Sequence, residues 1–209
     1  LHVSFLCVAI FRSERPEIRK IQSFLRQIAR AVDHMHSKRV IHGDLKMLNI
    51  VRSAHGGETA EDHLKLIDLD ACARVGQTVG KKFSSGIIPP EMIYKLKNEK
   101  EIKMHEYYFK GCSDDEDGPV ALWQKVKPLH NFVVRTFIAD KKNELPFDMV
   151  AAESTFDTWS FGTIAFQLIT EKPLFKVNRD DDITDWRDLS DLANWTDDFK
   201  DSRIAESLP

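Results

Sequence analysis

The chain has 209 residues, of which 42% are hydrophobic and 30% are charged, and its net charge is −3. These values fit one globular domain with a sizeable core, and they give no electrostatic reason to expect nucleic acid or an anionic membrane as a partner. Cys7, Cys72 and Cys112 are widely spaced and lie outside any CxxC pattern. They indicate neither a disulfide framework nor a zinc site, and they favour a reducing, cytoplasmic setting.

The apolar run at residues 1–11 opens the chain. It lacks the basic start and the cleavage site of a signal peptide, and it is far shorter than the roughly 18 residues of a membrane span. We expect a buried strand here. The first residue is Leu1, and the absence of an initiator Met suggests that the sequence begins partway through a longer protein.

Three segments have the apolar spacing of helices. Residues 16–36 carry one apolar stripe at intervals of three and four, and Pro16 suits the first turn of such a helix. Residues 155–170 are apolar on most faces, which predicts a fully buried helix. A weaker amphipathic helix is expected at 185–195, and the nine Asp residues between 180 and 201 are expected to form a solvated face.

Short β-rich runs lie between the first two helices. Residues 39–42, 48–51 and 64–69 are predicted to be strands, and Gly56-Gly57 marks a turn between the last two. A further strand is expected at 131–138. The loops that these strands flank are the natural places for functional residues.

One of these loops, within the segment 41–51 (IHGDLKMLNIV), carries Asp44, Lys46 and Asn49. These groups suit phosphoryl transfer, which needs a carboxylate to accept a hydroxyl proton, a cation near the moving phosphoryl group and an oxygen ligand for Mg²⁺. The next apolar strand ends at Asp68, a second carboxylate suited to a metal-phosphate cluster.

Four motifs occur in a characteristic order: HGDLKMLN at 42–49, DLD at 68–70, PPE at 89–91 and DTWSFG at 157–162. In this order they resemble the catalytic loop, the DFG motif, the APE motif and the DxWSxG helix of the eukaryotic-type protein kinase family. Each motif alone is a weak signal, whereas four in order form a specific one.

The resemblance implies a protein kinase-like C-terminal lobe, mainly α with short β-hairpins (α+β), with the N-terminal lobe absent. Residues 1–15 would be a remnant of the lobe-connecting region, and 16–209 the C-lobe, truncated before its last helices. Because the PPE and DTWSFG motifs are unusually far apart, an insertion is expected at about 92–145.

Carried over to this sequence, the resemblance makes Asp44 the catalytic base and Lys46 the contact to the γ-phosphate. Asn49 and Asp68 become the Mg²⁺ ligands, and ATP and Mg²⁺ the cofactors. Lys46, two places after Asp44, looks like the Ser/Thr-specific version of the loop, so the expected partners are proteins with Ser or Thr hydroxyls. The expected activity is that of an ATP-dependent protein serine/threonine kinase.

The resemblance also implies structural roles. His42 would pack under the catalytic loop, and Asp157 would tie the backbone of that loop to the 155–170 helix. Glu91 would anchor the activation segment through an ion pair, but its usual Arg partner would lie beyond Pro209.

The sequence departs from the family pattern within these motifs, and two of the departures bear on regulation and on the backbone. Gly43 replaces an Arg that in many kinases binds an activation-segment phosphate, which makes control through Thr78, Ser84 or Ser85 unexpected. Asp70 replaces a Gly and loses easy access to positive φ.

Upstream of Asp44 there are 43 residues, too few for the Gly-rich loop and the strand Lys of a kinase N-terminal lobe. We therefore expect weak turnover from this chain alone. Two other functions stay open: a pseudokinase that acts as an interaction module, and a small-molecule phosphotransferase with a similar HGD…N loop. The second is disfavoured by Lys46, Glu91 and the DTWSFG motif.

Overall fold

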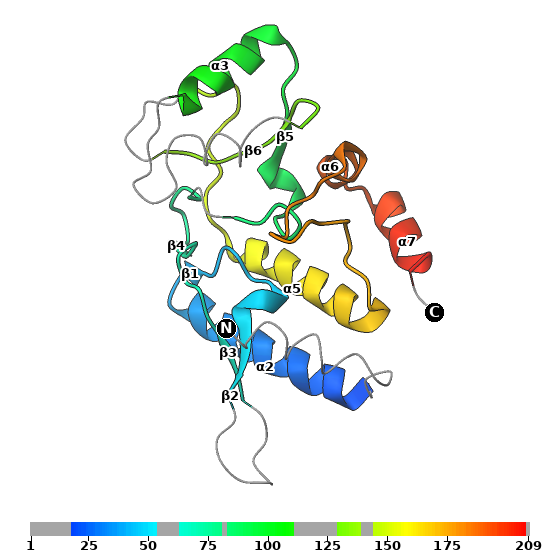
Figure 1. Ribbon diagram of the computed structural model, residues 1–209. Coiled ribbons are helices and arrows are strands. Elements are labelled where there is room, and N and C mark those ends of the chain that lie inside the picture. The colour runs from blue at the N-terminus through cyan, green and yellow to red at the C-terminus, as the bar shows by residue number, and fades with distance from the viewer. Residues whose placement is uncertain (1–17, 54–62, 81–82, 111–128, 139–143, 208–209) are drawn as a thin grey trace.

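The computed structural model describes residues 18–53, 63–80, 83–110, 129–138 and 144–207 (Figure 1). The strand expected at 1–11, the helical position of Pro16 and the turn at Gly56-Gly57 lie outside these residues.

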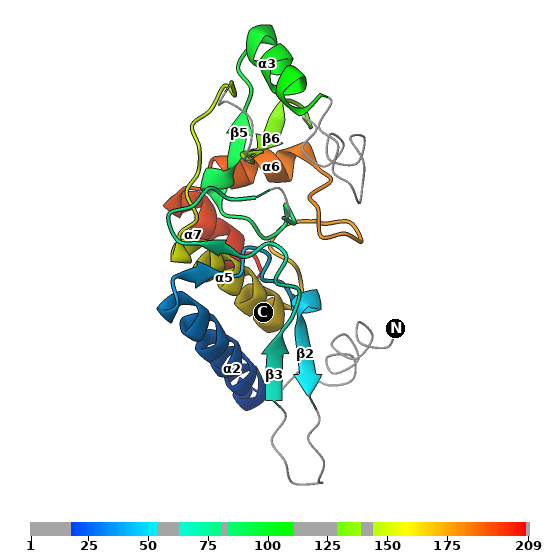
Figure 2. The same cartoon turned by 90° about the vertical axis from the view of Figure 1, so that its left-hand side faces the viewer.

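Two long helices form the base of the molecule. Helix α2 is Ile18–Ser37 and helix α5 is Ser154–Thr170, and they pack against each other in Figures 1 and 2. Both were predicted within three residues of their observed ends, because their apolar spacing is helical. Among the described residues, no helix has the length and apolarity needed to cross a membrane.

All described strands pair antiparallel in three two-stranded sheets. Strand β1 (Val40–Ile41) pairs with β4 (Ala73–Arg74), and β2 (Ile50–Ser53) pairs with β3 (His63–Leu66). Strand β5 (Ile93–Lys95) pairs with β6 (Phe132–Val134). The first three predicted strands and the one expected at 131–138 exist, although each is shorter than or displaced from its predicted range.

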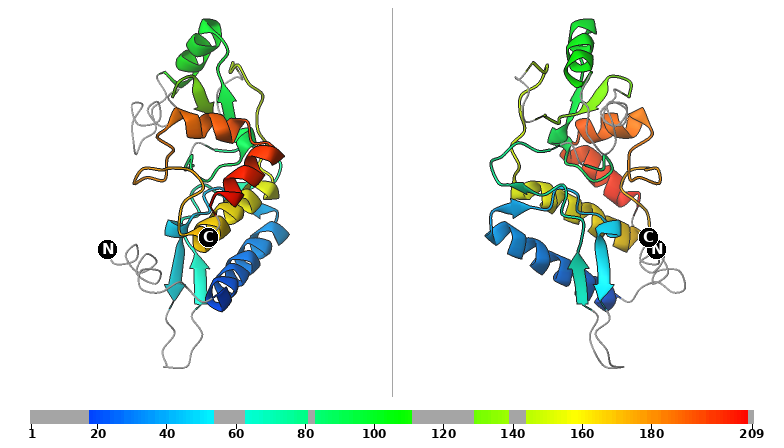
Figure 3. Two further views of the ribbon diagram at one scale, coloured as in Figure 1. Left: turned by 90° about the vertical axis from the view of Figure 1, so that its right-hand side faces the viewer. Right: turned by 60° about the vertical axis from the view of Figure 1, so that its left-hand side comes forward.

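The other α-helices among the described residues are α3 (Glu99–Phe109), α6 (Trp186–Ala193) and α7 (Asp197–Ala205). Helix α6 was predicted, whereas α3 and α7 were not. Helix α3, β5 and β6 lie at the end of the molecule opposite α2, as Figure 3 shows. The chain is therefore a mixed α/β structure of helices and small antiparallel sheets.

The described apolar side chains form two clusters. The smaller cluster joins α2 to α5 through the predicted catalytic loop and β2, and its buried members are Ile28, Val32, Leu45, Ile50, Ile164 and Leu168. The larger cluster contains Ile41 of β1, Phe109 of α3, Phe132 of β6 and Phe175, all 3% exposed or less. The segment 92–145 thus contributes to the main core.

The prediction that the 155–170 helix is fully buried was wrong. Thr155, Thr158, Gly162 and Ile169 are exposed, and Ile169 is 51% exposed. These positions follow one another at intervals of three, four and seven, so they lie on one side of the helix. Helix α5 therefore has an open stripe among the described residues, although apolar residues occupy most of its faces.

Candidate active site

The predicted catalytic loop, residues 42–49, follows β1 and is held in place by α5. Asp157 of α5 is fully buried, and its carboxylate accepts hydrogen bonds from the backbone N–H groups of His42 (2.8 Å) and Gly43 (3.0 Å). His36, at the end of α2, approaches the same carboxylate to 2.8 Å through Nε2. The expected tie between Asp157 and the loop is confirmed.

His42 lies under the loop, as expected, and is fully buried. Its Nε2 is 3.2 Å from the carbonyl oxygen of Ile67, and its Nδ1 is 3.4 Å from the backbone nitrogen of Asp44. The ring therefore joins the loop to the strand that leads to Asp68.

Gly43 has a φ of +77°, a conformation that glycine adopts without strain. A Cβ at this position would lie 2.3 Å from the carbonyl oxygen of Ala71. In the sequence, Gly43 appeared only as the loss of an Arg. In this structure the backbone at position 43 requires a glycine, because of its positive φ and the nearby carbonyl oxygen.

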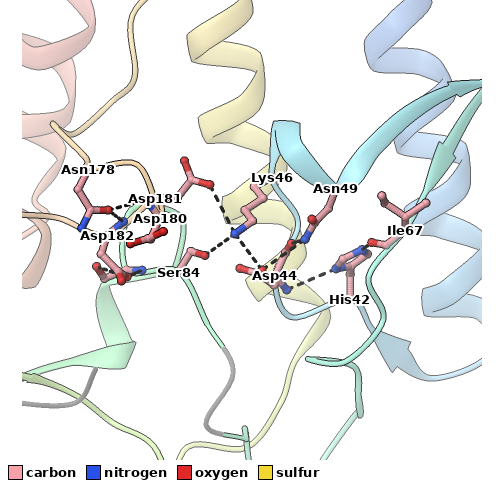
Figure 4. A network of polar contacts seen from close by, with 11 residues as sticks. His42, Asp44, Lys46, Asn49, Ile67, Ser84, Asn178, Asp180, Asp181 and Asp182 are labelled. Atoms are coloured by element: carbon pink, nitrogen blue, oxygen red, sulfur yellow. Dashed lines mark hydrogen bonds and ion pairs between the residues drawn. The ribbon is translucent and has the colours of Figure 1, made fainter. Parts of the chain in front are cut away.

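Asp44, Lys46 and Asn49 come together in the loop (Figure 4). The Asp44 carboxylate is buried; its Oδ2 accepts from Nδ2 of Asn49 at 3.3 Å and lies 3.3 Å from Nζ of Lys46. The same Asn49 amide donates to the backbone carbonyl of Asp44 at 2.8 Å. Asn49 thus holds both the backbone and the side chain of Asp44.

The other oxygen of Asp44, Oδ1, is buried and has no hydrogen-bond partner among the described residues. A buried carboxylate oxygen without a partner is costly, because it has lost its water without gaining a donor. Among the described residues, one acceptor position of the Asp44 carboxylate is therefore left without a donor, while the other oxygen lies beside the Lys46 ammonium.

Asp68 stands apart from these three residues. Its side chain is exposed, and among the described residues it makes no hydrogen bond or ion pair with Asp44, Lys46 or Asn49. The β2–β3 register nevertheless brings it to the same end of the hairpin as Asn49, because the backbone N–H of Ile67 donates to the Asn49 carbonyl at 2.9 Å.

In the DLD motif the residue with positive φ is Asp68 (φ +60°), and Asp70 does not have a positive φ. The expected backbone difficulty of an Asp in place of Gly at position 70 is therefore wrong for this structure. Asp is among the residues that tolerate the left-handed region best after Gly and Asn. The DLD sequence places such a residue where the chain takes that conformation.

Sequence reasoning missed two partners of Lys46. Its Nζ donates to Oγ of Ser84 at 2.8 Å and lies 3.4 Å from Oδ2 of Asp181. Ser84 was weighed only as a phosphorylation site, and Asp181 was placed on a solvated face. The second placement was wrong, since the Asp181 side chain is 26% exposed and lies at the catalytic loop.

A signal for this loop exists in the sequence. Asn178 is followed by Asp180 and Asp182, and the Asn178 side chain accepts from the backbone N–H groups of both, at 2.9 and 3.0 Å. Asn followed by Asp two residues on is a typical turn pattern, because Asn side chains bond to backbone groups nearby. The position of the turn against the catalytic loop has no local signal.

Burial changes the pKa of two groups near the site. It raises the pKa of the Asp181 carboxyl, an effect that the Lys46 ammonium opposes. It also raises the pKa of the Cys72 thiol, and the carboxylates of Asp157, Asp68 and Asp70 act in the same direction. Both effects disfavour the thiolate form of Cys72.

Ser84 and Ser85 are buried, and both hydroxyls are engaged. Oγ of Ser85 donates to Asp182 at 3.0 Å and accepts from the backbone N–H of Ile183 at 2.8 Å. A phosphate on Ser85 would meet the Asp182 carboxylate, and like charges at this distance repel. This geometry agrees with the expectation that phosphorylation here does not control the site.

A family model described as the protein kinase domain matches residues 7–110. The match includes Asp44, Lys46, Asn49, Asp68 and the PPE motif. The chain belongs to the eukaryotic-type protein kinase family.

Proposed function

We propose that the chain forms the C-terminal lobe of a protein serine/threonine kinase, which transfers the γ-phosphate of ATP to Ser and Thr hydroxyls of proteins. In this proposal residues 16–209 are the lobe, 1–15 belong to the region that connects the lobes, and about 92–145 are an insertion. The strongest support is the buried Asp44 carboxylate, which has one oxygen held by Asn49 and Lys46 and the other without a partner.

Asp44 acts as the base. Its Oδ1 accepts the proton of the substrate hydroxyl, whose oxygen then bonds to the γ-phosphorus as the bond to the leaving ADP breaks. Asn49 keeps the carboxylate in one orientation through its two hydrogen bonds. Because this geometry exists before the substrate binds, little reorganisation is needed during the reaction.

Lys46 supplies positive charge beside Asp44, at the place where the phosphoryl group would pass. Its side chain is 16% exposed, so its charge is less screened than it would be in water. Its place two residues after Asp44 also supports Ser/Thr specificity, through the resemblance to that version of the loop.

Asn49 and Asp68 are the proposed Mg²⁺ ligands. Both offer oxygen donors, which Mg²⁺ prefers, and the β2–β3 hairpin brings them to one end. Since Nδ2 of Asn49 is directed at Asp44, its amide oxygen is left for a cation. Bound Mg²⁺ supplies charge neutralisation for the ATP phosphates.

A pseudokinase scaffold is the second candidate, and one observation favours it. Asp68 and Leu69 are exposed, and Leu69 is 55% exposed. The metal-binding side of the site therefore lacks the packing that holds Asp44, at least among the described residues.

A Mg²⁺-ATP phosphorylation assay on the complete polypeptide tests the proposal, with a generic basic protein and Ser/Thr and Tyr peptides as substrates. We expect phosphate on Ser and Thr only. Asp44→Asn should lower kcat by about 100-fold or more, as loss of a general base does. Asp68→Ala should abolish the Mg²⁺-dependent activity. Asp33→Asn, which changes an exposed acid on α2, should leave activity unchanged.

The alternatives give different results. Activity that persists in Asp44→Asn would contradict the assigned base. No turnover and no nucleotide binding by the wild type would identify a scaffold. Phosphorylation of a free aminoglycoside without phosphorylation of peptides would identify a small-molecule phosphotransferase.

A further inference from the structure

The loop 177–183 follows α5 and carries Asp181. The loop is closed by a β-bridge between Val177 and Ile183, and Asn178 accepts hydrogen bonds from the backbone of two residues within it. Asp181 has a φ of +63°. This conformation is uncommon for a residue with a side chain, and it persists where surrounding contacts impose it.

The loop docks on the segment 84–86, which precedes the PPE motif. The carboxylate of Asp182 accepts from N and Oγ of Ser85, at 2.9 and 3.0 Å, and the backbone N–H of Gly86 donates to the carbonyl of Asp181 at 2.9 Å. A Cβ on Gly86 would lie 2.4 Å from Cγ1 of Val177. The two segments therefore fit together only with glycine at this position.

This docking fixes the Asp181 carboxylate relative to Lys46 (Figure 4). Nζ of Lys46 lies 2.8 Å from Ser84, 3.3 Å from Asp44 and 3.4 Å from Asp181. The ammonium thus stands between two carboxylates that come from chain segments far apart in the sequence. A lysine side chain is long and flexible, and it stays at one place only where partners hold it.

We propose that Asp181 is a positioning residue for the reaction: it holds the Lys46 ammonium beside Asp44, where the phosphoryl group is transferred. This inference rests on the proposed kinase function. Asp181 itself touches neither the substrate nor the reacting atoms, and it acts through Lys46. The other two partners of Lys46 cannot replace it, since Ser84 carries no charge and Asp44 is engaged as the base.

The experiment compares Asp181→Asn, which removes the charge and keeps the shape, with Asp181→Glu, which keeps the charge. Asp180→Asn is the matched control, because Asp180 is the exposed neighbour and its side chain is not directed at Lys46 in Figure 4. Two quantities are measured on the complete polypeptide. One is kcat and KM with a Ser/Thr peptide, and the other is acylation of Lys46 by an amine reagent, with exposed Lys38 as the internal reference.

We expect Asp181→Asn to lower kcat about tenfold with little change in KM for the peptide, as misplacement of a catalytic group does. Asp181→Glu should recover part of this loss, and Asp180→Asn should match the wild type. Acylation of Lys46, relative to Lys38, should rise in Asp181→Asn because the ammonium has lost one of its charged partners.

An unchanged or higher kcat in Asp181→Asn, in a protein whose wild type transfers phosphate, would overturn the proposal. Unchanged acylation of Lys46 would overturn it as well. If the wild type transfers no phosphate, the proposed function fails on its own, and the acylation of Lys46 then decides whether Asp181 holds the ammonium.

Discussion

The two hydrophobic clusters are built in opposite ways. The smaller cluster takes four of its six buried residues from α2 and α5, so most of it comes from two long helices. The larger cluster is assembled from short strands, loops and helices of 11 residues or fewer, apart from the residues of α5 that face it. The first is encoded locally by helical spacing, whereas the second depends on contacts between distant segments.

The catalytic loop lies between the clusters and depends on both. Ile41, just before the loop, belongs to the larger cluster, and Leu45 belongs to the smaller one; both are fully buried. Asp157 of α5 binds the loop backbone between them. The loop is thus fixed at each end by apolar packing and in the middle by a buried carboxylate.

The largest expected effect comes from removing that carboxylate. Asp157→Ala leaves the N–H groups of His42 and Gly43 without their acceptor, and at about 1–3 kcal/mol for each buried unpaired donor the free energy of unfolding should fall by about 2–6 kcal/mol. Denaturant unfolding measures the loss. The control is Glu153→Ala, which removes an exposed carboxylate one turn earlier in the chain.

Hydrogen exchange would show whether the two clusters then separate. If Asp157→Ala were as stable as Glu153→Ala, the loop would be held by apolar packing alone, and Asp157 would not contribute to joining the two clusters.

A smaller effect is expected on the pH dependence of stability, and it should come from the larger cluster. His105 of α3 is fully buried, its ring lies 4.8 Å from that of Phe109 and 6.1 Å from that of Phe147, and burial lowers its pKa to about 4. The unfolded chain binds this proton near pH 6.5, before the folded protein does. Stability is therefore complete above about pH 6.5 and falls as the pH drops toward about 4, by up to about 3 kcal/mol.

Thermal or denaturant unfolding between about pH 7 and about pH 4 tests this prediction. His105→Leu should remove most of the acid dependence, and His34→Gln, an exposed change on α2, should retain it. An identical pH dependence in wild type and His105→Leu would contradict the assignment.

The smallest expected effect concerns the backbone of the catalytic loop. Gly43→Ala adds a Cβ 2.3 Å from a carbonyl oxygen, in a region of positive φ, whereas Gly76→Ala has a similar φ (+90°) and no atom within 4 Å of its Cβ. Strain at one such residue costs about 1–3 kcal/mol. Both variants share that strain, so the difference between them reports the contact with the carbonyl oxygen, and overpacking of this kind costs about 1–3 kcal/mol. We expect Gly43→Ala to lose this amount beyond Gly76→Ala in urea unfolding, and equal losses would mean that the loop shifts freely.

The sequence was sufficient for the parts that are encoded locally. The spacing of apolar residues predicted α2 and α5, and the motif order placed Asp44, Lys46 and Asn49 in one loop, where the structure brings them into contact. The position of Asp68 at the end of an apolar strand could also be predicted. Its separation from Asp44, Lys46 and Asn49 could not.

The rest depends on tertiary contacts that leave no local pattern. Helix α3 was missed because its sequence is rich in charged residues, although His105, Tyr108 and Phe109 are buried. The open stripe on α5 was missed because apolar residues alone do not tell which faces are covered. Asp181 was assigned to a solvated face because it lies in a run of acidic residues. Its approach to Lys46, which is 135 positions earlier in the chain, depends on how the loop 177–183 docks.

The long separations within the site have a consequence for how the protein is made. Lys46 meets Ser84 across 38 positions, Ser85 meets Asp182 across 97, and His42 meets Asp157 across 115. Closing such long loops costs entropy, so contacts of this kind form slowly and late. During synthesis the catalytic motif leaves the ribosome early, and we expect it to stay without its geometry until α5 and the loop behind it have followed.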